Sequence, residues 1–426
     1  MAKGLLICAP KSGEGKTLIT LSLLKYFSSR GYRVQPFKVG PDYIDPKWHM
    51  FASGKPSYNL DLFSMGKERV RSLFYSKATL SDVAIVEGVM GLFDGRSSTF
   101  DVAKVLKIPL VLIIDTYGVA ESVAPLVKGF TERIKRASLT YALFLNRVSS
   151  ERHLLRLLKV LRKHPILGYL YRDQTLALPS RHLGLVLPEH LSFKTEVIER
   201  VANALDRSLN PEILNSFIMD TPKNLNAYSF IPELPQKNIS IAYDEAFNFY
   251  YQHILDEMKT RAVIHTFSPL RDETIPSGTE AIYIGGGYPE LYAEALSGNR
   301  KMAENLRQWI EDGLPLYAEC GGLIYLSKLL KWEDREYSMT GGFPFTICHS
   351  KLTLGYRYVT PMEEIPFFKS RAPFFAHEFH YTRIVESPCS RIKLIYKVST
   401  PEGATFTEGF KYKNALASYL HLLAFK

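Results

Sequence analysis

The chain has 426 residues, of which 46% are hydrophobic, so it can bury roughly two or three domain cores and is too long for one small fold. Its four cysteines are few and far apart, which excludes a disulfide framework, and no CxxC pair suggests a zinc site. The formal net charge of +10 would suit nucleic acid, an anionic membrane surface or a polyanionic substrate, but the basic residues are spread along the chain and favour ordinary solvated faces.

The first half of the chain alternates between short apolar runs and helical patterns. Because Lys3 and a stretch with glycine, proline and lysine interrupt the N-terminus, it has no segment suited to a signal peptide or a membrane span, and we expect a cytoplasmic protein. The later runs YRVQPFKVG, SDVAIVEG, IPLVLIIDT and TYALFLNRV read as buried strands. Their alternation with helices predicts an open, mostly parallel α/β sheet domain over residues 1–220.

The first strand-to-helix connection, ICAPKSGEGKTLIT, has the residues of a phosphate-binding loop. Glycines there let backbone N–H groups approach a phosphate, and the helix that begins in this segment favours an anion. Lys16 would neutralise phosphate charge, and the Thr17 hydroxyl would hold Mg²⁺. Pro10 replaces the usual first glycine, so the segment fits the variant K-x-G-x-G-K-T form, and a chance glycine-rich turn is the alternative. The predicted nucleotide-binding residues of the loop are Lys11, Gly13, Gly15, Lys16 and Thr17.

Two further loops that follow predicted strands carry carboxylates. VGPDYIDPKWH contains Asp42 and Asp45, and VEGVMGLFDG contains Glu87 and Asp94. Carboxylates grouped beside a triphosphate repel one another unless metal ions lie between them, so they predict Mg²⁺ ligands or residues that position a substrate carboxylate for attack on the γ-phosphate. The predicted metal ligands are Thr17, Asp45 and Glu87. Each acid taken alone is better explained as a helix cap or a turn residue, but four acids in two glycine-flanked loops favour a site.

Later in this domain, two segments offer weaker signals. Asn146 follows the buried strand in FLNRV and would read the adenine edge, because an amide offers one donor and one acceptor, although a turn residue at a strand end fits as well. Arg181 and His182, in RHLGLVLPEH, would face an anionic substrate.

A segment rich in proline and asparagine, residues 221–238, predicts an interdomain linker. The strand-and-turn pattern then resumes in ISIAYD, AVIHTFSP, AIYIGGGYPE and LPLYAECGG, with helical stretches between these segments. Residues 239–426 are therefore predicted to form a second α/β domain.

Cys320 is the one cysteine whose surroundings predict reactivity. The segment LPLYAECGGLIYL carries an apolar strand into Glu319-Cys320-Gly321-Gly322 and then into a helical run. Such an elbow exposes the thiol at the sheet edge, and a helix N-terminus stabilises a thiolate. A buried structural thiol is the alternative, and it fits Cys8, inside a strand, far better.

The cysteine would need an oxyanion site and a base. YIGGGYPE offers Gly285, Gly286 and Gly287, and we take the backbone N–H groups of Gly286 and Gly287 as the oxyanion donors. His421, in SYLHLLAF, is the predicted base, which takes the proton of Cys320 and later gives it to leaving ammonia. A core histidine is an equally good interpretation of His421. The rival bases in AHEFHY are His377 and His380.

Eight segments in order, from residue 9 to residue 421, resemble the cobyrinic acid a,c-diamide synthase family: APKSGEGKT, GPDYIDPKWH, EGVMGLFDG, LPSRHLGLV, GGGYPE, YAECGGLIYL, HEFHYT and ASYLHL. The resemblance implies a dethiobiotin-synthetase-like P-loop domain joined to a flavodoxin-like class I glutaminase domain. It implies that ATP, with Mg²⁺, phosphorylates the a and c carboxylates of a cobyrinic-acid-type tetrapyrrole in cobalamin biosynthesis, and that ammonia from glutamine displaces the phosphate. It also implies a homodimer.

Carried over by position, the family pattern assigns the acyl phosphate site to Asp42, Asp45, Glu87 and Asp94, the glutaminase nucleophile to Cys320 and its base to His421. Two features depart from related patterns. His421 is followed by Leu422 and Leu423, so the glutamate of a His-x-Glu triad is missing, which is similar to the cobyrinate branch. Lys11 resembles the lysine that deviant Walker ATPases extend across a dimer interface.

Three other functions compete with this one. The nearest is the same reaction on nickel-sirohydrochlorin, on the route to coenzyme F430, or on hydrogenobyrinate. A deviant-Walker regulatory ATPase with a glutaminase-like binding domain would have no need of Cys320. A nucleic-acid binder is favoured by the basic pI alone, without a recognition motif, so we expect neither nucleic acid nor a membrane as a partner.

Overall fold

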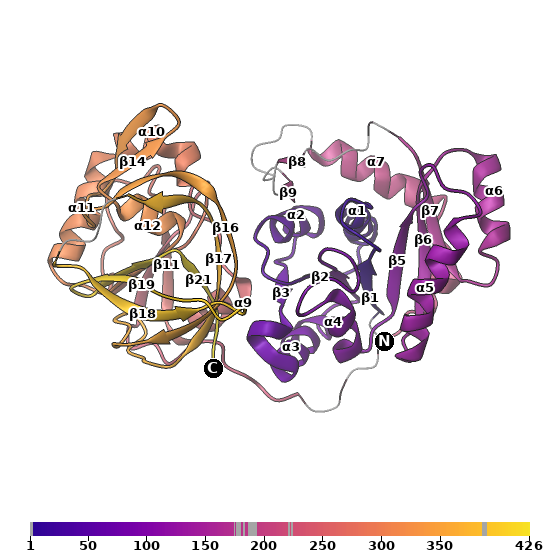
Figure 1. Cartoon of the computed structure of the whole chain (residues 1–426), viewed down its shortest axis with the longest axis horizontal. Helices are drawn as coiled ribbons and strands as arrows, with labels where there is room; N and C mark the ends of the chain where they lie inside the picture. The colour runs from indigo at the N-terminus through magenta and orange to yellow at the C-terminus, as the bar shows by residue number, and fades with distance from the viewer. Residues whose placement is uncertain are drawn as a thin grey trace. The chain divides into compact units, whose positions relative to one another are not determined.

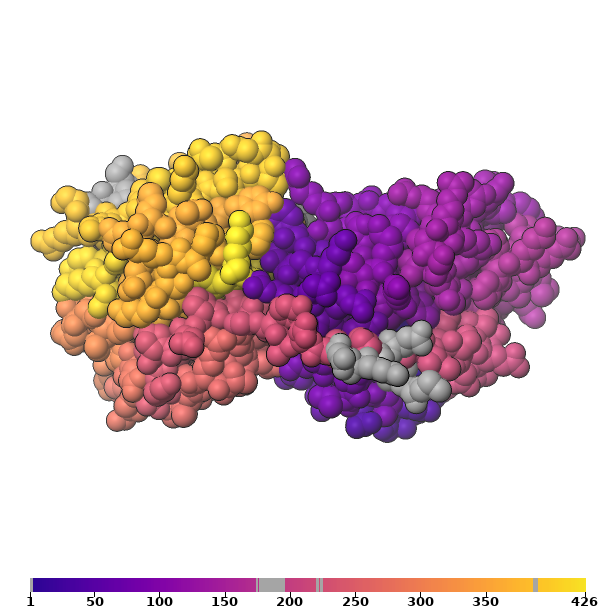
Figure 2. Space-filling view, turned by 90° about the horizontal axis from the view of Figure 1, so that it is seen from below, coloured from indigo at the N-terminus to yellow at the C-terminus, as the bar shows by residue number. Residues whose placement is uncertain are grey.

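The structure is a computed structural model that describes residues 3–173, 175, 180–181, 184–185, 194–219, 222, 225–385 and 390–426 (Figure 1). The chain divides into two compact units, Met1–Tyr228 and Ser229–Lys426. Figure 2 shows their surfaces coloured by position in the chain. Within the described ranges, no helix is both long and apolar enough to cross a membrane.

The first unit is built on a seven-stranded sheet in the order β3-β2-β4-β1-β5-β6-β7. All of its pairings are parallel. Its strands are β1 (Lys3–Cys8), β2 (Val34–Val39), β3 (Tyr58–Leu60), β4 (Val83–Glu87), β5 (Leu110–Asp115), β6 (Tyr141–Val148) and β7 (Ile166–Tyr171). The central strands are near-continuous apolar runs because helices cover both faces of the sheet (Figure 1).

The helices of this unit are α1 (Lys16–Ser28), α2 (Ile44–Ser53), α3 (Leu62–Ala78), α4 (Thr99–Leu106), α5 (Val123–Arg136), α6 (Glu151–Val160), α7 (Lys194–Asp206) and α8 (Pro211–Ser216). Helices α1 to α6 connect successive strands of the sheet, and α7 and α8 follow the last of them. A short antiparallel pair joins β8 (Ser180–Arg181) to β9 (Gly184–Leu185). Helices α1, α2 and α7 pack together on one face over a shared core that includes Leu5, Ile7 and Trp48. The carboxyl ends of β1, β2 and β4 are neighbours in the sheet, so the loops that follow them meet at one edge.

The second unit has a twelve-stranded mixed sheet in the order β11-β10-β12-β13-β20-β19-β18-β16-β14-β15, and β17 joins β16 to β21. Its strands are β10 (Asn238–Ala242), β11 (Val263–Phe267), β12 (Ala281–Ile284), β13 (Leu316–Glu319), β14 (Leu329–Trp332), β15 (Arg335–Ser338), β16 (Thr346–Pro361), β17 (Phe374–Ile384), β18 (Lys393–Ser399), β19 (Thr405–Tyr412), β20 (Ala415–Ser418) and β21 (Leu420–Phe425). The first five strands of the order pair in parallel.

The helices of the second unit are α9 (Gln252–Arg261), the 3-10 helix η3 (Pro289–Tyr292), α10 (Ala293–Gly298), α11 (Arg300–Glu311) and α12 (Gly321–Leu326). A core of side chains from β10, β12, β13, α11 and α12 holds the parallel part together. The predicted fold class, a mostly parallel P-loop α/β domain followed by a second α/β domain, is confirmed.

Candidate functional site

The loop between β1 and α1 has the backbone that phosphate binding requires. Gly13 and Gly15 have φ angles of +81° and +99°, a region in which glycine is strongly favoured. A Cβ on Gly15 would also lie 2.4 Å from the Nδ2 atom of Asn146. Lys16 begins α1, is 8% exposed and donates from Nζ to the carbonyl oxygen of Lys11 at 3.1 Å. Lys11 itself is exposed.

The two carboxylate loops meet beside this loop around a lysine that the sequence analysis did not select. The Thr17 hydroxyl donates to Oε1 of Glu87 at 2.6 Å. The Nζ of Lys38, on β2, lies 3.0 Å from the same Glu87 oxygen, 2.5 Å from Oδ2 of Asp45 and 4.0 Å from Oδ2 of Asp42. Lys38 and Glu87 are both fully enclosed. The structure therefore brings three of the predicted acids, Asp42, Asp45 and Glu87, to one buried ammonium group, and Thr17 joins them through Glu87.

Mutual attraction keeps Lys38 and Glu87 charged in this cluster, whereas burial, then Asp42, raises the pKa of Asp45 well above its ordinary value. Burial alone would lower the pKa of Lys38, but the carboxylates of Asp45, Glu87 and Asp42 raise it above its ordinary value. Burial would raise the pKa of Glu87, but Lys38, His49 and Thr17 lower it well below the usual range of a glutamate. Glu87 is therefore a carboxylate at neutral pH, despite its position in the interior.

His49, on α2, is the second residue that sequence reasoning missed. Its Nε2 lies 2.7 Å from Oε2 of Glu87, and its Nδ1 lies 2.9 Å from the Ser57 hydroxyl. It thereby fixes the Glu87 oxygen that Thr17 does not contact. The sequence does mark both residues. Lys38 is a lysine inside a mostly apolar strand, and His49 is the only histidine in the segment GPDYIDPKWH.

Asp42 and Asp94 each also accept backbone N–H groups in their own loops. Asp42 accepts the backbone N–H groups of Ile44 and Asp45 at the start of α2. Asp94 is exposed and accepts the N–H of Gly91 at 2.9 Å, with no recorded contact to Lys38.

Asn146 is also next to the phosphate loop. Its Nδ2 donates to the carbonyl oxygen of Glu14 at 2.9 Å, and its Oδ1 accepts the N–H of Arg147 at 3.0 Å. The amide therefore supports the loop, and its contact with adenine stays a prediction.

The oxygens of Thr17 and Glu87 fit a magnesium ion, which prefers oxygen ligands. Asp45, the third predicted ligand, contacts Lys38 instead. Among the described residues, no group of three or more His, Cys, Asp and Glu side chains is arranged to hold a metal by itself. A metal at this position would need oxygens of the phosphates as well.

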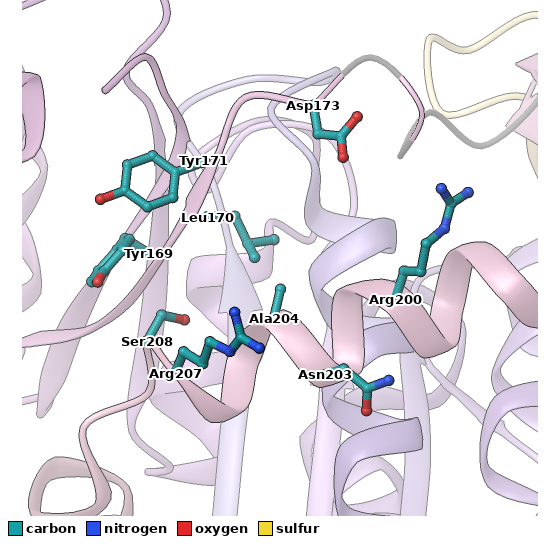
Figure 3. Close-up of a pocket in the computed structure, with 9 residues that line it drawn as sticks. All are labelled: Tyr169, Leu170, Tyr171, Asp173, Arg200, Asn203, Ala204, Arg207 and Ser208. Carbon is teal, nitrogen blue, oxygen red and sulfur yellow. The ribbon is translucent and has the colours of Figure 1, made fainter. Parts of the chain in front are cut away.

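A separate pocket of about 430 Å³ lies between β7 and α7 (Figure 3). Tyr169 and Tyr171 line it from the strand, and Arg200 and Arg207 line it from the helix. None of the predicted site residues lies in it. His182 is outside the described residues, and so is the side chain of Arg181.

In the second unit, Cys320 is at a strained turn between β13 and α12. Its φ and ψ angles are 46° and −98°, in a region that residues with side chains rarely adopt. The thiol donates to the carbonyl oxygen of Phe379 at 3.4 Å. Burial, then Glu290, raises the pKa of Cys320 well above its ordinary value, although a backbone hydrogen bond from Gly321 opposes them. The resting thiol is therefore protonated, and nucleophilic attack requires a base.

The glycine triplet packs against this turn. Gly322 donates its N–H to the carbonyl oxygen of Gly285 at 3.1 Å. A Cβ on Gly321 would lie 3.0 Å from the nitrogen of Gly287, and one on Gly286 would lie 2.3 Å from Cε1 of His421. The backbone of the triplet thus packs against both the Cys320 turn and the His421 ring.

His421 is on β21 and is completely buried. Its Nδ1 lies 3.6 Å from Oε2 of Glu319, the residue before Cys320. His377 is its register partner on β17, and burial, then His421, lowers the pKa of His377 to about 3, so this ring is neutral. His380 is engaged at both ring nitrogens, by Glu378 at 2.8 Å and by the carbonyl oxygen of Thr382 at 2.8 Å. Of the three histidines, His421 is the one in contact with Gly286.

Comparison with known proteins agrees with this arrangement. Residues 5–186 match the CobQ/CobB/MinD/ParA nucleotide binding domain, and residues 238–426 match the CobB/CobQ-like glutamine amidotransferase domain. The chain is 37% identical to the cobyrinate a,c-diamide synthase of Caldanaerobacter subterraneus, over 99% of this chain and 95% of that protein. It is also 37% identical to the enzymes of that name from Synechococcus sp., over 98% and 94% of the two chains, and from Listeria monocytogenes, over 98% and 95%.

These relatives match both units over nearly their whole length. The chain therefore belongs to the cobyrinate a,c-diamide synthase family.

Proposed function

We propose that this protein uses ATP and glutamine to convert the a and c carboxylates of cobyrinic acid into amides, in cobalamin biosynthesis. The observation that carries this proposal is the presence of two different sites in one chain of this family. One is a phosphate loop whose Thr17 contacts a buried carboxylate, and the other is a strained cysteine turn packed against a histidine and a glycine triplet. We assign activation to residues 1–220 and ammonia release to residues 239–426, with residues 221–238 as the linker.

In the activation step, the side chains of the first unit bind and orient the two reactants. Lys16 and the loop glycines bind the phosphates of ATP, and Thr17 and Glu87 hold Mg²⁺, which supplies charge neutralisation when it is bound. Lys38 keeps the carboxylate of Glu87 ionised and holds the Asp45 side chain in place. Asp42 and Asp94 orient the substrate carboxylate. The substrate carboxylate takes the γ-phosphoryl group and releases ADP, and ammonia then attacks the acyl phosphate and displaces inorganic phosphate to form the amide.

In the ammonia-releasing step, Cys320 and His421 act on glutamine. His421 accepts the thiol proton as the sulfur attacks the amide carbon, and the N–H groups of Gly286 and Gly287 stabilise the oxyanion. The proton then passes to the leaving ammonia, and water hydrolyses the thioester to glutamate. The raised pKa of Cys320 supports this proposal because it makes a base necessary.

The test is ATP hydrolysis in the presence of glutamine, with and without cobyrinic acid, combined with the mass of the macrocycle. Substrate should trigger turnover, and the mass should fall by about one unit for each carboxylate converted to an amide. Cys320→Ala should retain amidation with free ammonium and lose it with glutamine. Product from nickel-sirohydrochlorin or hydrogenobyrinate, but not from cobyrinic acid, would keep the mechanism and change the substrate. If the rate of ATP hydrolysis is the same with and without each of the three macrocycles, and the same in Cys320→Ala, the regulatory ATPase would be favoured.

A further inference from the structure

We infer that Glu319 takes the place of the missing third member of the glutaminase triad, as the residue that positions His421. The sequence after His421 is Leu422-Leu423, so no glutamate follows the base at the position where a His-x-Glu motif would have it. The structure assigns a carboxylate to the same task from a different strand. The inference rests on the proposed roles of Cys320 and His421.

The geometry of Glu319 supports this assignment. Its side chain is 2% exposed, that of His421 is 0% exposed, and Oε2 lies 3.6 Å from Nδ1 of the ring. This separation is longer than a hydrogen bond, as is common for catalytic contacts before the substrate binds. Nδ1 is the ring nitrogen that an acid must engage if Nε2 is to receive the proton of the thiol. Glu319 therefore faces the nitrogen that, on the proposed roles, does not take the thiol proton.

Glu319 is also held rigidly. Its Oε1 accepts the backbone N–H of Leu422 at 2.9 Å, directly after the base. Burial, then the Glu319 carboxylate, raises the pKa values of Tyr283 and Tyr317, so both of these buried side chains lie close to it. One carboxylate thus fastens the end of β13 to the strand that carries His421, and a single substitution would disturb both the position and the tautomer of the ring.

Glu319 is also the direct neighbour of the nucleophile in the chain. Glu319, which orients the base, and Cys320, the nucleophile, therefore lie together at the end of β13. The relative positions of the nucleophile and the base then depend on the hydrogen bond from Leu422 to Glu319 and on Gly286, which packs against the His421 ring. Other charged and titratable groups near the ring are His377, beside it on β17, with Arg357 and Glu378 behind.

The experiment compares Glu319→Gln with wild type and with Cys320→Ala in the full chain. We expect Glu319→Gln to reduce kcat for glutamine hydrolysis roughly 100-fold, since general base catalysis is worth at least this factor, while ammonium-dependent amidation is retained. The substitution keeps the shape and the carbonyl oxygen for the N–H of Leu422. Tyr317→Phe removes a buried hydroxyl close to the same carboxylate and leaves Glu319 itself unchanged, so its loss should be far smaller.

Two readouts separate positioning from a merely structural role. The rate of Cys320 alkylation by iodoacetamide should shift its pH dependence in Glu319→Gln, because the imidazole loses its partner. In a His421→Ala background, Glu319→Gln should cause little further loss, because a residue that acts through His421 has nothing left to act on. Equal losses in both backgrounds, or an unchanged alkylation profile, would overturn the inference.

The two proposals fail in different ways. If Cys320→Ala retains glutamine-dependent amidation, the proposed glutaminase itself is wrong. If Cys320→Ala abolishes it but Glu319→Gln hydrolyses glutamine at the wild-type rate, the glutaminase stands and only the role of Glu319 is rejected.

Discussion

The hydroxyl of Thr17 donates a hydrogen bond of 2.6 Å to Oε1 of Glu87, which joins the phosphate loop to the end of the neighbouring strand β4. The contact spans 70 positions of the sequence and exists because β1 and β4 are adjacent in the sheet. A substitution at Glu87 therefore alters a direct contact of the phosphate loop.

Glu87→Gln should therefore inactivate the amide-forming reaction and spare glutamine hydrolysis. The amide still accepts from Thr17, but it removes the negative charge that Lys38 and a bound magnesium ion require. We expect amidation to fall roughly 100-fold or more with either glutamine or ammonium as the nitrogen source. Glutaminase activity, measured as glutamate release, should persist. The exposed pair of Glu132 with Lys128 provides the matched control, Glu132→Gln, which should behave as wild type. A selective loss with glutamine alone would contradict the assignment.

Lys38→Met should destabilise the first unit because it leaves Asp45 and Glu87 facing each other in the interior. Removing one partner of a buried ion pair costs about 3–5 kcal/mol, which for a unit of this size lowers the melting temperature by roughly 10 °C. Thermal unfolding followed by calorimetry measures the change. In the double variant Lys38→Met/Glu87→Gln, the loss should be smaller than the sum of the two single losses. Additive losses would mean that the two side chains do not interact.

The motifs that could be predicted from the sequence are those whose functional residues lie close together in the chain. The loop glycines before Lys16 and the turn at Cys320 each lie within one strand-to-helix connection, so spacing alone predicts their conformation. The structure gives Gly13, Gly15 and Cys320 the positive φ angles that these motifs require.

Lys38, His49 and Glu319 were missed because their roles depend on which strands are neighbours. The order β2-β4-β1 places Lys38 beside Glu87, and the closeness of β13 and β21 places Glu319 beside His421. A single sequence indicates that these strands exist but not their order. The triad motif predicts a glutamate after His421, whereas the structure places one before Cys320.

Glu408 predicts a pH dependence of stability in the second unit. Burial raises the pKa of Glu408 from 4.5 to about 8, although Ser418 and the N–H of Tyr419 donate hydrogen bonds to it. Between these pH values the folded protein keeps a proton that the unfolded chain has lost, so the free energy of unfolding should decrease as pH rises from about 4.5 to 8.

Glu408→Gln should remove this contribution. Denaturant unfolding of both proteins at several pH values measures the difference, and the variant should gain stability relative to wild type by at most about 1.4 kcal/mol per pH unit across that window. A difference that is independent of pH would show that Glu408 does not keep its proton.

Gly286→Ala should separate the two half-reactions by steric exclusion alone. The new Cβ would lie 2.3 Å from Cε1 of His421, so the ring or the glycine triplet must move. Because a displaced base no longer reaches Cys320, we expect glutamine-dependent amidation to fall roughly 100-fold while ammonium-dependent amidation persists. Gly298→Ala, where a Cβ meets nothing within 4 Å, controls for the general cost of replacing a glycine. Parallel assays with the two nitrogen sources, and a melting temperature for each variant, complete the comparison. Equal activity of Gly286→Ala and Gly298→Ala with glutamine would place the base elsewhere, and His377, the register partner of His421, would then be the next residue to replace.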